Sequence, residues 1–317
     1  MTGPTGPAES PLVAYRRALA TAGERDQSLW VLEARAAPET AASAFAQRFP
    51  ARWKVLPLQE REVVDAARSH SEGKEAVFLD APVSFLLEQA FPLLVRSLVH
   101  PRRNVTLVGL GTEAASTQAR PVLPVRNDLA TMRALPEMTV VAPADAPTTH
   151  GAVLALADHR GPAYLRVPPV TAQPLTDGTF AVGRAHEIRP GSDLTVVALG
   201  PLLAPALTLA DELARVGVST RVLDVASVKP FDEGAVLRAA RDTGAILVLE
   251  AAPLADGVGT LVAALTAENY PVPVRRIGPA DVPAERDAAD GADDLAQSLE
   301  RARDEAFELL RLRGKIT

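Results

Sequence analysis

The sequence predicts an α/β protein of two domains, each a mostly parallel sheet covered by helices. Short β-rich apolar runs alternate with longer amphipathic segments, which is typical of parallel strands connected by helices. This pattern stops at residues 169–181, a stretch rich in Pro, Thr and Gly, and then restarts, so we expect a linker there. A chain of 317 residues is also long enough for two domains that each bury a core.

The first domain is expected over residues 12–168, after a Gly- and Pro-containing disordered tail at residues 1–11. Apolar runs rich in β-formers predict its strands at 28–34, 76–81, 104–110, 138–143 and 162–167. The longer segments between them predict helices at 38–48, 59–70, 84–99 and 145–158.

The second domain is expected over residues 182–317 and repeats the same alternation. Its predicted strands span 193–200, 219–225, 245–251 and 272–278. A helix over 205–217 ends at a glycine, and the next helix has Asp232 placed to cap its start and Gly244 to cap its end. The last 25 or so residues form a strongly periodic helix with an apolar stripe that covers the sheet or a partner.

Composition excludes several classes of function. The net charge of −6 offers no electrostatic footprint for nucleic acid or anionic lipid. With no cysteine there is no disulfide framework, no thiolate nucleophile and no cysteine-based metal site, and the five histidines show no metal-ligand spacing. The N-terminus lacks the features of a signal peptide, and no apolar run is long enough for a membrane span. We therefore expect a soluble, cytoplasmic protein.

Two sequence stretches resemble the transketolase family. The run DLATMRALPEMTVVAPADA, followed by GPAYLR, resembles the pyrimidine-binding domain of transketolases and related thiamine-diphosphate enzymes. In the second half, Lys229-Pro230 precedes a capped helix, Glu250 follows an apolar strand and Gly257-x-Gly259 opens a helix, as in the transketolase C-terminal domain. The resemblance runs from Phe45 to Ala280 and implies a thiamine-diphosphate pyrimidine-binding fold followed by a transketolase C-terminal fold.

The resemblance also implies a missing half. Full-length family members carry an N-terminal domain with a G-D-G…N motif, whose Asp and Asn hold a divalent cation on the cofactor diphosphate, and this chain has no such motif. The cofactor thiamine diphosphate, with its Mg²⁺, would be held by a separate diphosphate-binding subunit. The resemblance therefore implies a split enzyme that is active only with this partner, in a heterotetramer that includes a contact between two copies of this chain.

Glu60 is the candidate catalytic and cofactor-binding residue. The gap-free resemblance over residues 45–138 places it on the family's catalytic glutamate, which shares a proton with the aminopyrimidine ring nitrogen of the cofactor. This role requires a carboxylate at the start of a helix, at a subunit interface dry enough to raise its pKa. The alternative is that Glu60 only favours the dipole at the helix start, since acidic residues are common there.

The other candidate residues stand where the family pattern is partly lost. Of the family's T-F-x-x-F aromatics only the second, Phe85, remains; it is either a cofactor contact or a core residue of its helix. The substrate loop G-E-D-G-x-T-H-Q is replaced at residues 117–124, with alanine and leucine in place of its Asp and His. Arg166 and Arg120 are the candidate substrate-binding residues, although isolated arginines often only solvate a surface, and Pro169 stands at the family's second arginine.

Three functions remain open from the sequence. The first is the pyrimidine-binding and C-terminal subunit of a two-component transketolase-like transferase, which passes a two-carbon ketol or similar acyl-anion unit to a non-standard acceptor. The second is a degenerate, non-catalytic scaffold or regulatory subunit, favoured by the altered loop and the lost aromatic. The third is a 2-oxo acid dehydrogenase beta-like subunit, suggested by the pattern Pro57-Leu58-Gln59-Glu60.

Overall fold

A computed structural model of the chain describes residues 8–35, 43–73, 75–110, 127–168, 173–279 and 288–314, with no side chains described for 288–298. The chain divides into two compact units, Met1–Val182 and Gly183–Thr317. Each unit has its own sheet, so the predicted α/β class with two mostly parallel sheets is confirmed. Among the described residues, no helix is both long enough and apolar enough to span a membrane.

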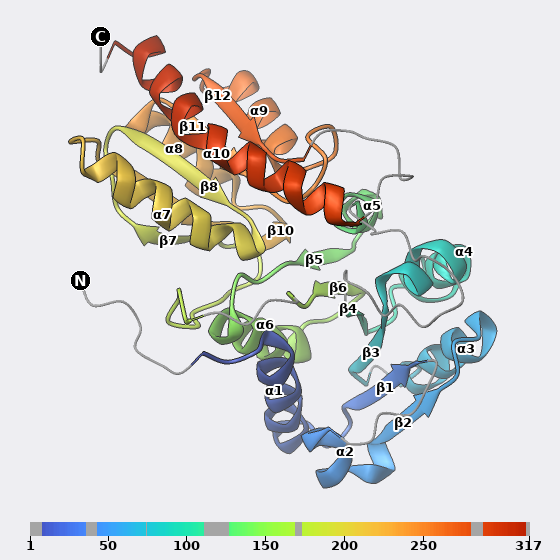
Figure 1. Cartoon of the computed structure of the whole chain (residues 1–317). Helices are drawn as coiled ribbons and strands as arrows, with labels where there is room; N and C mark the ends of the chain where they lie inside the picture. Colours follow the sequence, from blue (N-terminus) through green and yellow to red (C-terminus); the bar gives the residue numbers. More distant parts are fainter. Residues whose placement is uncertain are drawn as a thin grey trace. The chain divides into compact units, whose positions relative to one another are not determined.

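The sheet of the first unit is parallel throughout the pairs described, in the order β5-β6-β4-β3-β1-β2 (Figure 1). Its strands are β1 (Trp30–Ala34), β2 (Trp53–Leu56), β3 (Val77–Pro82), β4 (Val105–Leu110), β5 (Thr139–Val141) and β6 (Ala163–Arg166). The five predicted strands are confirmed to within two residues at most boundaries. The short edge strand β2 was not predicted, because its four residues do not make a complete apolar alternation.

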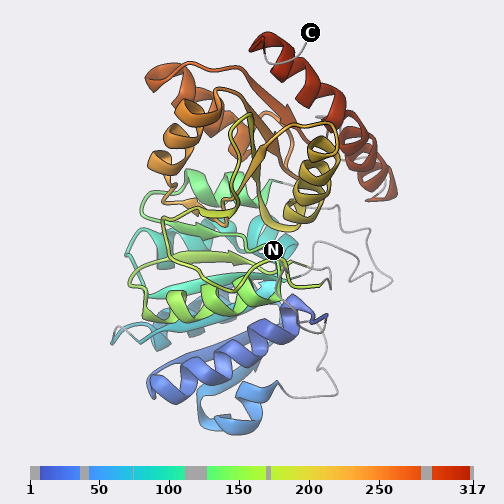
Figure 2. The same cartoon turned by 90° about the vertical axis from the view of Figure 1, so that its left-hand side faces the viewer.

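Helices cover both faces of this sheet. They are α1 (Pro11–Arg25), α2 (Ala44–Arg48), the 3₁₀ turn η1 (Pro50–Arg52), α3 (Glu60–His70), the π-helical turns η2 (Phe85–Gln89) and η3 (Val95–Val99) flanking α4 (Phe91–Leu94), α5 (Asp128–Ala134) and α6 (Ala146–Asp158). Helix α1, which was not predicted, packs along α6 (Figure 2). Of the predicted helix 38–48 the structure shows only α2, residues 36–42 lying outside the described residues.

The helix predicted over 84–99 is instead three short helical segments. Pro92 occupies the first turn of α4, where it has no N–H to donate to the preceding turn. The backbone on both sides of it adopts π-helical turns rather than continuous α-helix. The helical stretch predicted over 84–99 is therefore confirmed along nearly all of its length, with a break at Ala90.

Arg52, the residue before β2, binds the end of helix α1. Its guanidinium donates to the backbone oxygens of Asp26 at 2.8 Å and Gly23 at 3.0 Å, and it lies 4.2 Å from the centre of the Phe49 ring. Gly23 lies in the last turn of α1, and Asp26 is the C-cap residue of this helix. Arg52 thus satisfies backbone oxygens that the end of α1 leaves without partners.

The segment before the second unit packs against α6. Asp145 caps this helix by accepting from the Thr148 amide at 2.9 Å, and its second oxygen accepts from the amides of Leu175 and Thr176, each at 2.8 Å. A Cβ on Gly151 would lie 2.5 Å from the backbone oxygen of Gly178, so the two backbones are in close contact. Residues 173–181 of the predicted linker thus belong with the first unit, as does Val182, and residues 169–172 lie outside the described residues.

The second unit has a five-stranded sheet in the order β12-β11-β8-β9-β7, parallel except for the antiparallel edge strand β7. Its strands are β7 (His186–Arg189), β8 (Leu194–Ala198), β9 (Thr220–Asp224), β11 (Ile246–Leu249) and β12 (Val274–Ile277). The short strand β10 (Ser227–Lys229) is not part of this five-stranded sheet. Its helices are α7 (Leu203–Ala214) after the turn η4 (Gly200–Leu202), α8 (Glu233–Thr243), α9 (Val258–Asn269) and α10 (Ala288–Leu312).

The predicted caps of α8 are confirmed. The Asp232 side chain accepts from the Ala235 amide at 2.9 Å, and Gly244 ends the helix at φ 65°, in the left-handed region that favours glycine. At the start of α9, the buried Glu250 carboxylate accepts from the Gly259 amide at 3.2 Å. A Cβ on Gly257 would overlap this carboxylate, which explains the Gly257-x-Gly259 pattern.

Candidate functional site

Glu60, Phe85 and Arg166 all lie at the carboxyl edge of the first sheet. Glu60 follows β2, Phe85 follows β3 and Arg166 is the last residue of β6. In the sheet order, β2 is separated from β3 by β1, and β4 lies between β3 and β6. Loops at the carboxyl ends of parallel strands are the usual position of ligand sites in α/β folds. Residues predicted from separate motifs are thus brought to one edge.

Glu60 is the first residue of α3, and its side chain is exposed. Strand β2 ends at Leu56, and the turn through Pro57 brings the chain to the start of the helix, where Gln59 is the N-cap residue but makes no side-chain cap. The first-turn amides of α3 favour a negative charge at this end. The arrangement presents an acceptor-only carboxylate on the surface of this chain, at the edge where the strands end.

Phe85 lies inside the chain, with 1% of its surface exposed. It opens the π-helical turn η2 directly after β3 and is among the largest fully buried side chains. Its neighbours Val83 and Leu86 are also buried. In this arrangement the ring contributes to the core beneath the carboxyl edge and presents no face to solvent.

Arg166 forms a buried polar cluster with Asp128 and Tyr164. Asp128, the first residue of α5, is fully buried; it accepts from Tyr164 Oη at 2.6 Å and Arg166 Nε at 2.9 Å, and Arg166 Nη2 also pairs with it. Burial alone would lower the pKa of Arg166, but Asp128 and Tyr164 raise it above its ordinary value. Burial, with the Asp128 charge, also raises the pKa of Tyr164 well above its ordinary value. The Arg166 charge is therefore balanced within the chain.

Gly109 makes room for this cluster. A Cβ on this residue of β4 would overlap the Tyr164 hydroxyl and lie 2.9 Å from a methyl group of Val83. Arg120, the other candidate substrate-binding residue, and the altered loop at 117–124 both lie outside the described residues.

A second buried polar cluster, which the sequence did not predict, lies between β1 and β3. Glu33 of β1 and Asp80 of β3 are in register on adjacent strands and both are buried. Tyr15 of α1 donates its hydroxyl to Asp80, while Trp53 Nε1 donates to Glu33 at 2.8 Å and Arg35 forms an ion pair with Glu33 at 3.3 Å. The only signal in the sequence was a carboxylate inside each of two apolar strand runs.

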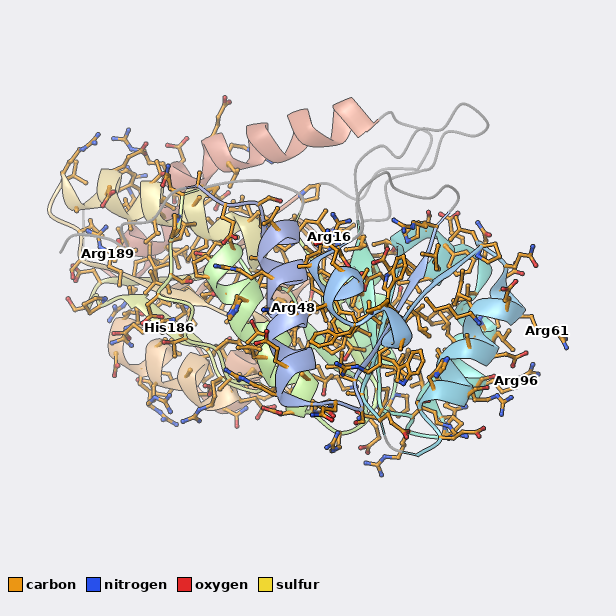
Figure 3. The ribbon with its side chains drawn as sticks, turned by 90° about the horizontal axis from the view of Figure 1, so that it is seen from below. Arg16, Arg48, Arg61, Arg96, His186 and Arg189 are labelled. Atoms are coloured by element: carbon orange, nitrogen blue, oxygen red, sulfur yellow. The ribbon has the colours of Figure 1, made fainter. Side chains whose placement is uncertain are left out.

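Burial raises the pKa of Asp80 to about 8. The hydrogen bond from Tyr15 opposes this rise, whereas the neighbouring Glu33 charge adds to it. Arg16, which lies on α1 (Figure 3), and Arg35 lower the pKa of Asp80. Desolvation therefore dominates, and Asp80 holds a proton near neutral pH. No group of three or more His, Cys, Asp or Glu side chains suited to a metal ion occurs among the described residues.

Comparison with known proteins agrees with this architecture. The family model described as "Transketolase, C-terminal domain" matches residues 183–294. The chain is 31% identical over 261 residues to the 6-deoxy-6-sulfo-D-fructose transketolase subunit SqwH of Clostridium sp. (strain MSTE9), covering 81% of each chain. It is 30% identical over 237 residues to one of the subunits of the apulose-4-phosphate transketolase of Phocaeicola vulgatus, covering 74% of this chain and 76% of that one.

Solved structures lead to the same family. A split-gene transketolase, described as an inactive β4 tetramer, superposes with a TM-score of 0.84 at 32% identity, covering 95% of this chain and 99% of that one. A transketolase of Pichia stipitis shares the fold at 14% identity with a TM-score of 0.74, and this chain spans 48% of its length. The chain therefore belongs to the transketolase family, as the half that carries the pyrimidine-binding and C-terminal domains.

Proposed function

We propose that this chain is the pyrimidine-binding and C-terminal subunit of a two-component, thiamine-diphosphate-dependent transketolase-like enzyme. It would transfer a two-carbon ketol or similar acyl-anion unit and would be active only with a diphosphate-binding partner. The observation that carries this proposal is the position of Glu60, an exposed carboxylate that begins a helix at the carboxyl edge of the pyrimidine-binding sheet.

Glu60 fits a contact with the pyrimidine end of the cofactor, whereas Phe85 fits such a contact less well. An exposed carboxylate at a helix start is free to meet a ring nitrogen presented by a partner subunit, and docking of the partner would supply the dry surroundings that the role requires. Phe85 is less suited to stack on the cofactor, because its ring is 1% exposed and would have to leave the core. We therefore assign the cofactor contact to Glu60 first.

Bound thiamine diphosphate would supply the acyl-anion chemistry by which a two-carbon unit passes from donor to acceptor. The Glu60 carboxylate would share a proton at the aminopyrimidine ring nitrogen. Arg166 would act by holding Asp128, and with it the start of α5, rather than by binding substrate directly, because its Nε and Nη2 already contact that carboxylate. Arg120 remains a proposed substrate contact, and Mg²⁺ would be held by the partner.

The substrate proposal follows from the relatives. One similar subunit is named for 6-deoxy-6-sulfo-D-fructose and another for apulose 4-phosphate, both of them unusual sugars. The replaced loop at 117–124 removes the family's sugar-binding Asp and His. We infer that the acceptor or donor is likewise a non-standard sugar. The relative described as an inactive β4 tetramer supports the inference that this chain alone assembles with itself without activity.

Substitution of Glu60 tests the proposal. In the complex reconstituted with the diphosphate-binding partner, Glu60→Gln should lower turnover by about 10²–10⁴-fold, because the amide cannot exchange the proton. Glu62→Gln is the matched control: Glu62 is also exposed and also lies in the first turn of α3, and its substitution should leave turnover within about twofold. Full activity of Glu60→Gln would contradict the catalytic assignment.

The rival function is a non-catalytic scaffold subunit. The burial of Phe85 and the internal pairing of Arg166 favour it, since both remove side chains from a working site. Equilibrium dialysis of thiamine diphosphate with Mg²⁺, using this chain, the partner and the pair, separates the two. If the chain is catalytic, the pair should bind thiamine diphosphate more tightly than either chain alone, and Glu60→Gln should weaken this binding. If the chain is a scaffold, the partner alone should bind thiamine diphosphate as tightly as the pair does.

A further inference from the structure

A pocket of about 550 Å³ lies at the amino edge of the first sheet, opposite the candidate functional site. Its walls are formed by the residues that follow α3, by the turn before β4 and by the turn before β6. These turns bring Arg102 and Arg103 close to Arg160, which is 57 residues further along the chain. The proposed transketolase-like function makes no use of this edge.

The pocket has more positive than negative charge. Three arginines line it against one carboxylate, that of Glu72. Glu72 pairs with Arg68 at 3.0 Å but lies 3.9 Å from Arg103, at the limit of an ion pair. Arg103 Nε is buried and makes no hydrogen bond within the described part of the chain. No described residue forms a salt bridge with Arg160. Two of the guanidinium groups thus have hydrogen-bonding capacity left for a ligand.

Arg102 occupies a backbone conformation that favours glycine. Its φ is 56°, and its amide donates to the Val99 oxygen at 2.9 Å, so it ends the helical segment that contains η3. The chain places Gly244 in the same conformation at the end of α8. Glu137 is also left-handed, at φ 58°, and forms an ion pair with Arg102 at 2.6 Å. Glu137 therefore holds the third guanidinium of the pocket.

We propose that this pocket binds a phosphorylated small molecule. Guanidinium forks match the oxygens of phosphate groups and bind them by paired hydrogen bonds. The volume falls within the range of about 300–1,000 Å³ for small-molecule sites, which favours a compact phosphate ester over a macromolecule. Arg103 and Arg160 provide the main contacts, and Arg102 contributes when Glu137 releases it.

Calorimetric titration of the full chain with inorganic diphosphate and inorganic phosphate, at one fixed ionic strength, tests the proposal. The parent protein should show saturable binding with one site per chain. Arg160→Ala should weaken it by about tenfold or more, since a hydrogen bond to a charged group is lost. Arg103→Lys, which keeps the charge but not the fork, should weaken it as well. Glu137→Gln should tighten it, because Arg102 is released.

Arg96→Ala is the matched control. Arg96 is an exposed arginine of the same unit, on the outside of the helices next to α3 (Figure 3), and its loss changes the net charge equally. Binding within twofold of the parent is expected for it. Absence of saturable binding, an equal loss in Arg96→Ala, or a loss confined to Arg120→Ala would overturn the proposal. So would saturable binding of an acidic peptide that diphosphate fails to displace.

Discussion

At the scale of single residues, Asp80 makes stability depend on pH. Its pKa is raised to about 8 in the folded chain, against an ordinary value of 3.8. The folded state therefore binds this proton more tightly than the unfolded state does. The resulting stabilisation is fully present below pH ~4 and is lost as the pH rises toward ~8, with an upper limit of ~6 kcal/mol from the size of the shift.

Asp80→Asn should abolish most of this dependence. The amide keeps a hydrogen-bond acceptor for Tyr15 but cannot ionise in the buried site. Urea unfolding at pH 5, 7 and 9 should therefore show a free energy of unfolding that falls with pH in the parent and stays nearly flat in the variant, which becomes the more stable protein at pH 9. Asp65→Asn, at an exposed position of α3, serves as the control and should follow the parent. A variant whose stability falls with pH as steeply as the parent's would show that another group is responsible.

Single residues of the candidate site were only partly predictable. The position of Glu60 at a helix start followed from the resemblance and from the acidic run around it. The cluster of Tyr15 and Asp80 was not predictable, because the two residues are 65 positions apart and meet only once α1 has packed against the sheet. Phe85 illustrates the opposite case: its default interpretation as a core residue agrees with its burial.

At the scale of elements, the start of α9 depends on two glycines. A Cβ on Gly257 would overlap the buried Glu250 carboxylate, and one on Gly259 would lie 2.7 Å from it. Gly257→Ala should therefore destabilise the second unit by ~1–3 kcal/mol, as overpacking of a filled interior does. The expected result is a lower urea midpoint with an unchanged slope.

Gly234→Ala is the control for this prediction. Gly234 lies in the first turn of α8, where the nearest atoms to a new Cβ belong to the flexible end of Arg238, 3.2 Å away. The added methyl group should leave stability unchanged or raise it by up to ~1 kcal/mol through helix propensity. Equal effects of the two substitutions would show that the Glu250 contact does not constrain the backbone.

Helices with capping residues at their ends were predicted well, whereas elements without such residues were not. The helix with Asp232 and Gly244 at its ends begins and ends as expected. The break around Pro92 was missed because apolar residues continue on both sides of it, which keeps the helical pattern intact. Strand β2 is too short to show a period, and it becomes a strand only by pairing with β1.

At the scale of the whole molecule, alternation along the chain predicted two parallel sheets but not their strand order. The order depends on which crossovers bring distant strands together, and this information is not local. The boundary between the units lies at Val182 and Gly183, because the segment before it is tied to Asp145 of the first unit.

The second unit should fold as an independent domain. Its sheet is complete in itself, and helices on this unit cover a core made of its own aliphatic side chains. A fragment of residues 183–317 should therefore unfold in one cooperative transition followed by circular dichroism, with helix and strand content retained at about 25 °C. A featureless, non-cooperative signal from the fragment would mean that the first unit is required for its folding.

The close contact of the Glu250 carboxylate with Gly257 and Gly259 also limits how these positions can change among relatives of this chain. A Cβ on either glycine would lie too close to the Glu250 carboxylate, so neither glycine position can gain a side chain while this carboxylate is kept. A lineage that shortened or lost this acidic side chain would relax both glycines at once, and a lineage that acquired a side chain at Gly257 would first have to lose the carboxylate. Covariation of these three positions would mark which transketolase C-terminal domains keep the buried carboxylate against the two glycines.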